Sequence, residues 1–182
     1  SGTIGKTTDG GANWTELTSG TNHSLFSVYL TDANTGYAVG GNGSTANSIL
    51  KTTDSGITWT AQTSGTTNTF TSVYFLDSNT GYIAGRNGTI LKTTDGGANW
   101  VNQNSNTTKW LESICFADAN TGYAVGWTGT FLKTTDGGTN WIAQAINGNT
   151  LLSVYFPDVN TGYAVGGYGT ILKTTDGGTT WA

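Results

Sequence analysis

Short apolar stretches alternate along the chain with turn-forming stretches of Asp, Asn, Thr and Gly. One such pattern occurs four times, as SVYLTDANTGYAVG at 27–40, SVYFLDSNTGYIAG at 72–85, SICFADANTGYAVG at 113–126 and SVYFPDVNTGYAVG at 153–166. The first stretch of each copy is apolar on both faces, which is typical of a strand buried on two sides. Asp and Asn bond to the backbone of a turn and Gly adopts positive φ, so each DxNTG sequence predicts a tight turn between two strands.

A second pattern of nine residues lies between these copies. It reads KTTDGGANW at 6–14 and 92–100, KTTDSGITW at 51–59, KTTDGGTNW at 133–141 and KTTDGGTTW at 173–181. The spacings between its successive Asp residues are 45, 41, 41 and 40, and a period of this length is typical of propeller repeats. Each unit divides into four short strands, the last of which starts at the Trp. Four-stranded antiparallel units repeated about an axis predict an all-β protein, a β-propeller.

The units predict a single propeller domain with about four full blades and an N-terminal half-blade. The half-blade covers 1–20, and the blades cover about 21–64, 65–105, 106–146 and 147–182. The chain starts at the third strand of a unit and ends at the start of a fourth strand. Three interpretations of these ends stay open. The chain is a fragment of a longer propeller, or its N-terminal strands complete the last blade, or the ends complete each other between chains, giving a homo-oligomer or polymer.

The pattern TxDxGx[NT]W resembles the Asp-box, or BNR repeat, of sialidases and other propellers. The longer pattern, SVYF-D-NTGYAVG-GTILKTTDGG-W, resembles the repeats of the Ycf48/HCF136-like group, named for a photosystem II assembly factor, and is similar to repeats of secreted bacterial surface proteins. The resemblance covers essentially the whole chain. It implies a propeller fold and, as one function, a protein-binding chaperone of photosystem assembly.

We interpret the repeated boxes as structural joints rather than as active parts. In an Asp-box the Asp accepts backbone N–H bonds across the turn, the Gly takes positive φ, and the Trp packs against a neighbouring sheet. All nine Asp of the chain lie in a box or in a DxNTG turn, so the repeat accounts for every one of them. The predicted structural residues are Asp9, Asp54, Asp95, Asp136, Asp176, Trp14, Trp59, Trp100, Trp141 and Trp181.

Composition and charge exclude several classes of partner. Charged residues make up 10% of the chain and the net charge is −4, so no basic stripe exists for nucleic acid. The sequence contains no apolar run of about 18 residues, so it predicts no membrane span. One Cys and one His provide no zinc cluster and no Ser-His-Asp machinery, and we expect no metal and no cofactor. Low charge with many Thr and Asn favours an extracellular or cell-surface bacterial protein, and the resemblance implies the thylakoid lumen or periplasm as the alternative.

The carboxylates argue against an enzyme. A sialidase-like site resembles a cluster of arginines, and the chain has one Arg. Other Asp-box glycoside hydrolases need two carboxylates about 5–9.5 Å apart. Glu16 and Glu112, the only acids outside the repeat, belong to distant blades. We therefore expect no catalytic residues and interpret the chain as a non-enzymatic secreted or cell-surface propeller that binds a protein or glycan, scaffolds an assembly or self-assembles. The second interpretation is a chaperone of photosystem assembly, and an Asp-box glycoside hydrolase is the third.

The antiparallel order of the strands places the near-identical turns on one face and the variable connections on the other. Exposed aromatic and polar side chains there predict a site for a protein or a glycan, and the alternative is that the aromatics only cover blade edges. The candidates are Arg86, Trp127, Tyr168, Trp110, Lys109 and His23. Cys115 stands where other units have Tyr, so we expect a buried apolar side chain. We expect Glu112 to face the central channel.

Overall fold

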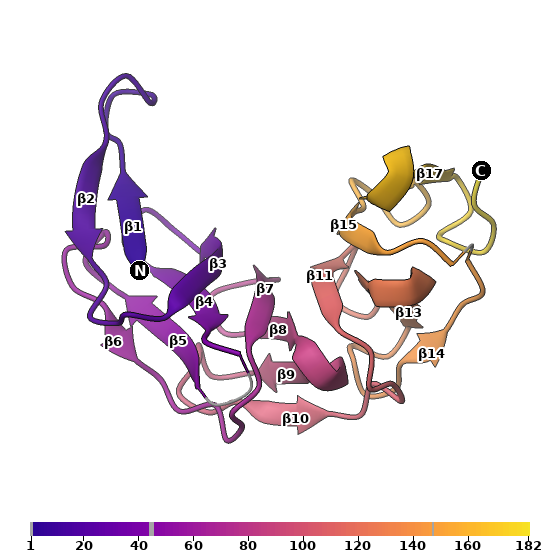
Figure 1. Ribbon diagram of the computed structural model, residues 1–182, viewed down its shortest axis with the longest axis horizontal. Helices are drawn as coiled ribbons and strands as arrows, with labels where there is room; N and C mark the ends of the chain where they lie inside the picture. The colour runs from indigo at the N-terminus through magenta and orange to yellow at the C-terminus, as the bar shows by residue number, and fades with distance from the viewer. Residues whose placement is uncertain (1, 44–45, 147) are drawn as a thin grey trace.

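The protein forms five antiparallel sheets that follow one another in chain order. The structure is a computed structural model that describes residues 2–43, 46–146 and 148–182. The sheets stand side by side in an open crescent whose two ends lie apart (Figure 1). This architecture is a partial β-propeller, as the repeat predicts, and the strands of each sheet are consecutive in sequence.

Three sheets have four strands, the first has two and the last has three. The first sheet contains β1 (Thr3–Lys6) and β2 (Thr15–Thr18). The second contains β3 (Ser24–Leu30), β4 (Gly36–Gly41), β5 (Asn47–Thr52) and β6 (Thr60–Ala61). The third contains β7 (Phe70–Phe75), β8 (Gly81–Gly85), β9 (Ile90–Thr93) and β10 (Val101–Gln103). The fourth contains β11 (Leu111–Phe116), β12 (Gly122–Gly126), β13 (Phe131–Thr134) and β14 (Ile142–Ala143). The fifth contains β15 (Leu151–Tyr155), β16 (Gly162–Gly166) and β17 (Ile171–Thr174).

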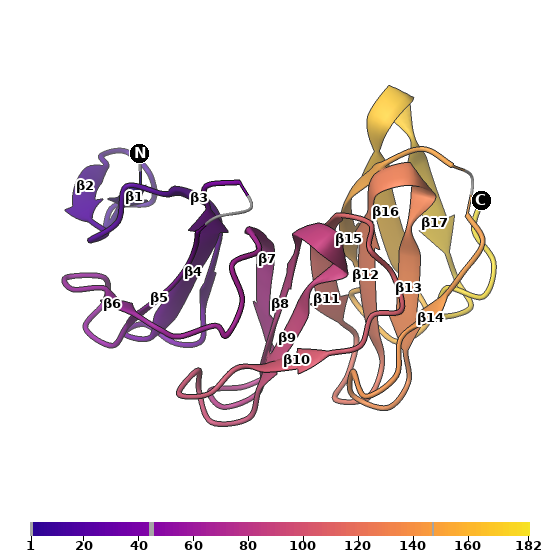
Figure 2. The same cartoon turned by 60° about the horizontal axis from the view of Figure 1, so that its bottom comes forward.

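The first strand of each larger sheet lies on the inner side of the crescent. Strands β3, β7, β11 and β15 contact one another in that order, and β6, β10 and β14 lie on the outer side (Figure 1). Three one-turn 3-10 helices, η1 (Arg86–Gly88), η2 (Trp127–Gly129) and η3 (Gly167–Gly169), cap the upper ends of the sheets in Figure 2. The Asp-boxes therefore lie at the opposite ends of the sheets.

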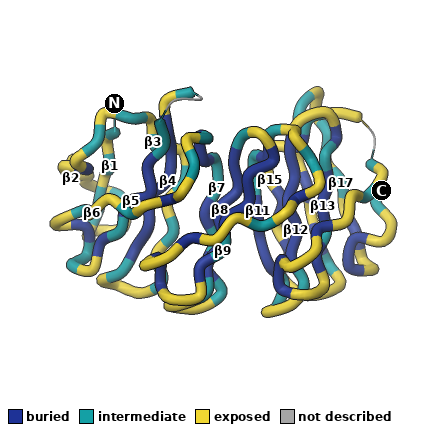
Figure 3. The backbone as a smooth tube through the Cα atoms, turned by 90° about the horizontal axis from the view of Figure 1, so that it is seen from below, coloured by how far each residue is buried: buried dark blue, intermediate teal, exposed yellow. Residues whose placement is uncertain are grey.

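The core lies between neighbouring sheets, and the central strands are buried while the turns are exposed (Figure 3). Each sheet has a front face toward the following sheet and a back face toward the preceding one. Tyr37 of one front face stacks on Phe75 of the next back face with ring centroids 4.0 Å apart. Trp100 meets the same Phe75 edge-on at 6.0 Å. Such packing repeats at the next two junctions, with Tyr82 on Phe116 at 4.0 Å and Tyr123 on Phe156 at 3.6 Å.

A polar joint accompanies this packing. The Tyr37 hydroxyl and the Lys51 ammonium both donate to the backbone carbonyl of Gly96, each at 2.7 Å. Gly96 belongs to the Asp-box of the following sheet, so two side chains of one sheet hold one carbonyl of the next. The same pair of donors reaches Gly137 from Tyr82 and Lys92, and Gly177 from Tyr123 and Lys133. The first sheet has no equivalent Tyr and offers Lys6 alone, which donates to the Ser55 carbonyl at 2.7 Å.

The box presents that carbonyl because its own side chains fix the turn. Thr93 donates to the Asp95 carboxylate at 2.8 Å and accepts the Gly97 N–H at 2.9 Å. Asp95 also accepts the Asn99 N–H at 2.9 Å. The box is tied to the DxNTG turn of its own sheet, since the Gly96 N–H donates to the Asn79 carbonyl at 2.9 Å. Both kinds of turn thus share one end of the sheet, as the strand order predicts.

The box tryptophans act by packing. The buried indole N–H groups of Trp59, Trp100, Trp141 and Trp181 have no hydrogen-bond partner in the described part of the chain. Trp141 is 1% exposed between two sheets, whereas Trp14 is 66% exposed because no other sheet of the described residues covers it. Trp14 instead lies beside Gly5, where an added Cβ would come within 3.3 Å of the indole ring.

This contrast gives a matched test at one repeat position. We expect Trp141→Ala to lower the free energy of unfolding by about 3–5 kcal/mol, since it empties a packed site between sheets. Trp14→Ala should change it by less than about 1 kcal/mol because that ring is largely in water. Urea unfolding followed by circular dichroism measures both, and equal losses would contradict the packing role.

Candidate functional site

The candidate site lies at the end of the sheets opposite the Asp-boxes, where a 3-10 turn meets the start of an inner strand. The Arg86 N–H donates to the Thr69 carbonyl at 2.9 Å, and the Trp127 N–H donates to the Trp110 carbonyl at 2.9 Å. The Gly167 N–H makes the same contact with Thr150 at 2.8 Å. The first residue of each turn is therefore fixed beside the residue that precedes β7, β11 or β15.

Four side chains from two sheets form a continuous row, which we call the Trp110–Trp127 cluster. The Arg86 guanidinium carbon lies 4.0 Å from the ring centroid of Trp110. The rings of Trp110 and Trp127 are 4.4 Å apart and inclined by 50°. Trp127 Nε1 donates to Glu112 Oε1 at 2.5 Å. The cluster thus presents one cation, two indoles and one carboxylate, and each group orients its neighbour.

A hollow of about 400 Å³ opens over this cluster. Three sheets contribute to it, and its lining consists of Phe26, Thr69, Thr71, Arg86, Trp110, Glu112 and Trp127. Two of its aromatic rings remain in contact with water, since Phe26 is 54% exposed and Trp127 is 43% exposed. The hollow combines aromatic surface with a cation, so it fits a ligand that carries an apolar group and a carboxylate.

The structure brings together three of the six residues that the sequence singled out, namely Arg86, Trp110 and Trp127. The other three do not line the hollow. His23 Nδ1 lies 2.9 Å from Ser48 Oγ, and Tyr168 is 97% exposed on η3. Lys109 precedes Trp110 and is exposed.

Sequence reasoning missed Phe26, Thr69 and Thr71. A signal for two of them was present, because Phe26, Thr71 and Glu112 occupy the same position in successive repeats. All three line the hollow, so this position of the inner strand faces the site in every sheet that contributes to it.

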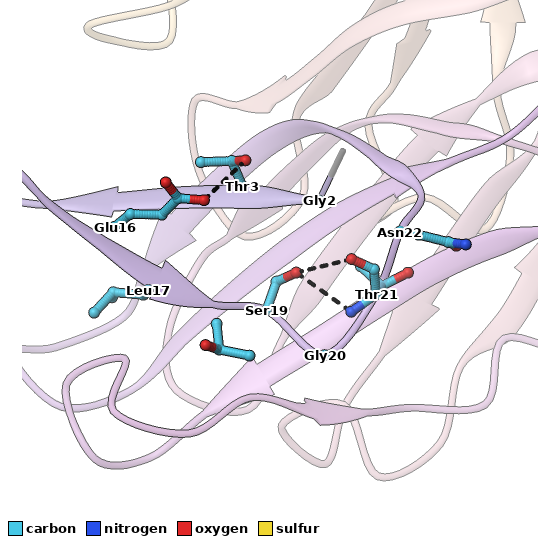
Figure 4. A pocket seen from close by; sticks show the side chains of 9 residues that line it. Gly2, Thr3, Glu16, Leu17, Ser19, Gly20, Thr21 and Asn22 are labelled. Carbon is cyan, nitrogen blue, oxygen red and sulfur yellow. Dashed lines mark hydrogen bonds between the residues drawn. The ribbon is translucent and has the colours of Figure 1, made fainter.

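A second hollow, of about 650 Å³, lies beside the first sheet and is shown in Figure 4. Its lining runs over Gly2 and Thr3 and from Glu16 to Asn22. Thr3 donates to Glu16 at 3.4 Å, and Ser19 bonds with Thr21 (Figure 4). Glu16 is the one carboxylate there, and Glu112 lines the other hollow. The structure therefore does not place the two non-repeat acids in one site.

The repeated aspartates are occupied as turn acceptors. Hydrogen bonds from Asn13 and Thr7 lower the pKa of Asp9 to about 2, and bonds from Asn99 and Thr93 lower that of Asp95 to about 2. Bonds from Thr58 and Thr52 do the same for Asp54, and bonds from Asn140 and Thr134 for Asp136. Asp176, bonded by Thr180 and Thr174, is lowered further. Such carboxylates stay ionised near neutral pH and are poor general acids.

Cys115 is 5% exposed, and burial raises the pKa of its thiol to about 12. It is therefore a buried apolar side chain rather than a nucleophile. Among the described residues no group of three or more His, Cys, Asp or Glu is arranged to hold a metal ion. In the same part of the chain no helix has the length and apolar character needed to cross a membrane.

The family model of photosynthesis system II assembly factor YCF48 matches the chain at residues 6–107, 63–142 and 99–182. No curated protein matches the chain significantly.

Several solved structures share its fold. One is YCF48 bound to D1 peptide, at 18% identity over 88% of this chain and 82% of that chain, with a TM-score of 0.59. YCF48 from Cyanidioschyzon merolae is 21% identical over 89% of this chain, with a TM-score of 0.68, and the match spans 56% of its length. An ancestral GH74 enzyme is 20% identical over 98% of this chain, with a TM-score of 0.73, and the match spans 28% of its length. At these identities the likeness establishes the propeller fold.

The depressed pKa values of the boxes predict how stability depends on pH. An unfolded Asp takes up a proton near pH 3.9, whereas Asp9, Asp54, Asp95 and Asp136 resist protonation until about pH 2. Their contribution is therefore complete above about pH 4 and is lost as the pH falls toward 2. We expect the free energy of unfolding, measured with urea, to drop across that window.

Asp95→Asn is the control for this prediction. The variant should be less stable than the parent chain near neutral pH, and the difference should shrink toward pH 2 as the parent loses the same charge. A parent stability that stays constant between pH 4 and pH 2 would contradict the role of the carboxylates.

Proposed function

The chain belongs to the family of photosynthesis system II assembly factor YCF48, and from this premise we propose that it is a non-enzymatic, protein-binding propeller that holds a peptide segment of its partner at the Trp110–Trp127 cluster. The observation that carries the proposal is the row of Arg86, Trp110, Trp127 and Glu112 beneath a hollow of about 400 Å³.

The peptide class is supported by the family and by the shape of the hollow. One similar structure is that of YCF48 bound to D1 peptide, so a propeller of this fold accepts a peptide. In this chain the hollow is open and spans three sheets, which suits a segment of chain more than a compact small molecule.

The chemistry of the cluster specifies what such a segment should carry. Arg86 is the only arginine of the sequence, and its position over the Trp110 ring leaves the edges of the guanidinium for hydrogen bonds. A carboxylate of the ligand, from a side chain or a C-terminus, is the natural partner for those donors. An apolar side chain of the ligand would then cover the exposed rings of Trp127 and Phe26, while Glu112 keeps Trp127 oriented.

We propose that the protein is not an enzyme because its hollow lacks a pair of carboxylates. Glu112 is its one carboxylate, and it already accepts the Trp127 indole N–H. Glycoside hydrolysis requires a pair of carboxylates about 5–9.5 Å apart. The similarity to GH74 enzymes concerns the fold alone.

A glycan is the second candidate ligand, favoured by the two adjacent indoles, since sugars pack against exposed aromatic rings. The binding experiment below separates the two classes. For the setting we propose an extracytoplasmic location, which rests on the low charge and the Thr and Asn content of the sequence.

The test is isothermal titration calorimetry with a D1 peptide and, separately, with xyloglucan oligosaccharides, since a GH74 xyloglucanase shares the fold. We expect the peptide to bind, and Trp127→Ala to weaken it at least about tenfold, because a central exposed Trp typically contributes more than 1.4 kcal/mol to binding. Arg86→Lys should weaken it as well, since Lys keeps the charge but loses the planar donors.

Tyr168→Ala is the matched control, because Tyr168 lies on the equivalent turn η3 and outside the hollow. Its affinity should equal that of the parent chain. The proposal would be contradicted if the parent chain did not bind the peptide, or if the Trp127→Ala variant bound it as tightly as the parent chain. Binding of the oligosaccharides instead would favour the glycan, and their cleavage, abolished in Glu112→Gln, would establish an enzyme.

A further inference from the structure

The turn that carries Arg86 is held by a short chain of side-chain hydrogen bonds. Thr89, which follows η1, donates its hydroxyl to the Arg86 carbonyl at 2.7 Å. The same hydroxyl accepts a bond from Asn68 Nδ2 at 2.9 Å. Thr89 is 5% exposed, so its hydroxyl depends on protein partners. We call these two contacts, from Asn68 through Thr89 to Arg86, the η1 brace.

The brace has a defined direction. A hydroxyl has one proton to donate and two lone pairs with which to accept. Because the Asn68 amide occupies an accepting position of Thr89, the Thr89 proton is directed to the Arg86 carbonyl. Asn68 is itself oriented, since Asn87 Nδ2 donates to Asn68 Oδ1 at 2.9 Å. The amide group of Asn68 therefore keeps its N–H side toward Thr89.

The brace fixes a residue whose other contacts lie on two sheets. The Arg86 N–H donates to the Thr69 carbonyl at 2.9 Å, so both backbone polar groups of Arg86 are held. Gly88 has a φ of +68°, and the Thr107 carbonyl occupies the space that a Cβ there would need. The guanidinium carbon then lies 4.0 Å from the ring centroid of Trp110 on the following sheet. The backbone of η1 thus determines how Arg86 reaches the Trp110–Trp127 cluster.

The second and fifth sheets have a comparable contact at the equivalent position. In the fifth sheet Asn149 Nδ2 donates to Thr170 Oγ1 at 3.0 Å, and Thr170 donates to the Gly167 carbonyl at 2.7 Å. In the second sheet His23 Nδ1 lies 2.9 Å from Ser48 Oγ. His23 therefore holds a hydroxyl of its own sheet, which explains why it does not line the hollow.

The fourth sheet lacks this contact. Lys109 stands at the equivalent position, and in the described part of the chain its side chain makes no hydrogen bond to Thr130. Thr130 still donates to the Trp127 carbonyl at 2.7 Å, and Glu112 holds the Trp127 indole. The two halves of the Trp110–Trp127 cluster are thus positioned by different contacts, the η1 brace for the cation and Glu112 for the exposed indole.

We propose that Asn68 is a positioning residue of the peptide site, which fixes η1 through Thr89 and thereby sets the direction in which Arg86 presents its guanidinium to a carboxylate of the ligand. This inference rests on the proposed peptide-binding function. Asn68 does not line the hollow, so it acts through Arg86 rather than on the ligand. A guanidinium that is oriented beforehand loses less freedom on binding a carboxylate with two parallel bonds.

The first experiment is calorimetric titration of the D1 peptide. Asn68→Ala should weaken binding about fivefold, the scale of one hydrogen bond. Asn149→Ala is the matched control, because it removes the same contact beneath η3, which lies outside the hollow. Its affinity should equal that of the parent chain. Equal affinity of Asn68→Ala and the parent chain would overturn the proposal.

Double variants separate positioning from a general loss of stability. Combined with Arg86→Ala, Asn68→Ala should cause no further loss, because the residue that it positions is gone. Combined with Trp127→Ala, it should cause its full loss of about fivefold, since Glu112 holds that indole independently. Losses of equal size in both backgrounds would contradict action through Arg86.

Rescue tests the hydrogen bond itself. Asn68→His should bind the peptide more tightly than Asn68→Ala, because His23 shows that an imidazole at this position reaches a hydroxyl of the third strand. Asn68→Leu fills a similar volume without a donor and should bind like Asn68→Ala. Equal affinities of the His and Leu variants would show that the amide of Asn68 does not act by donating.

Hydrogen exchange measured by NMR tests the brace without a ligand. The Arg86 and Thr89 amides both donate within this turn, so Asn68→Ala should speed their exchange by about fivefold and leave the Trp127 amide unchanged. Unchanged exchange at Arg86 and Thr89 would overturn the positioning role even if the parent chain binds the peptide. Faster exchange in a chain that binds no peptide would support the brace and contradict the proposed function alone.

Discussion

The contact on which this fold depends is the one between a lysine, a tyrosine and a single backbone carbonyl of the following sheet. Apolar packing alone tolerates small rotations of one sheet on another, because it has no direction. Tyr37 and Lys51 both donate to one carbonyl of the next sheet at 2.7 Å. These two directional bonds to a single oxygen atom fix where the next sheet lies. The carbonyl must be held still for this, and Thr93 and Asp95 hold it. The repeated pattern thus acts across units, since its Lys donates to the following sheet and its Gly carbonyl accepts from the preceding one.

Much of the fold could be predicted from the sequence, because the turn chemistry and the period are both local. Positive φ at Gly97 and the carboxylate of Asp95 follow from residue type alone. The role of the repeated lysines could not be predicted, since Lys51 finds its acceptor 45 residues away in another unit. The site shows the same limit. The aromatic residues Trp110 and Trp127 stood out as exceptions to the repeat, but Phe26 reaches the same hollow only through the placement of two neighbouring sheets.

The molecule is divided into a constant end and a variable end, and such a division lets one fold host different binding sites. At the Asp-box end the Tyr and Lys side chains join one sheet to the next, and Thr and Asp fix the turn that accepts them, so substitutions at these positions act on the assembly of the crescent. At the other end the 3-10 turns are held by backbone bonds, such as that from Trp127 to Trp110, which any residue except proline can donate. The side chains Arg86 and Trp127 are therefore free to differ while the turns keep their shape. A rigid frame with exchangeable side chains supports binding specificity without a change of fold.

The near-identity of the units also bears on how the chain reaches its structure. Each sheet is made of strands that are consecutive in sequence, so each sheet can form within one unit. Such a chain has several places at which folding can start and spread to its neighbours. The same similarity makes a hairpin of one unit an acceptable substitute for that of another, so a growing chain samples wrong partners of almost equal energy. Two features make the units unequal. The connection between β4 and β5 is longer than its counterparts, and Gly5 stands where the later units have Leu. These departures from the repeat identify individual sheets and help the chain to choose one order of assembly.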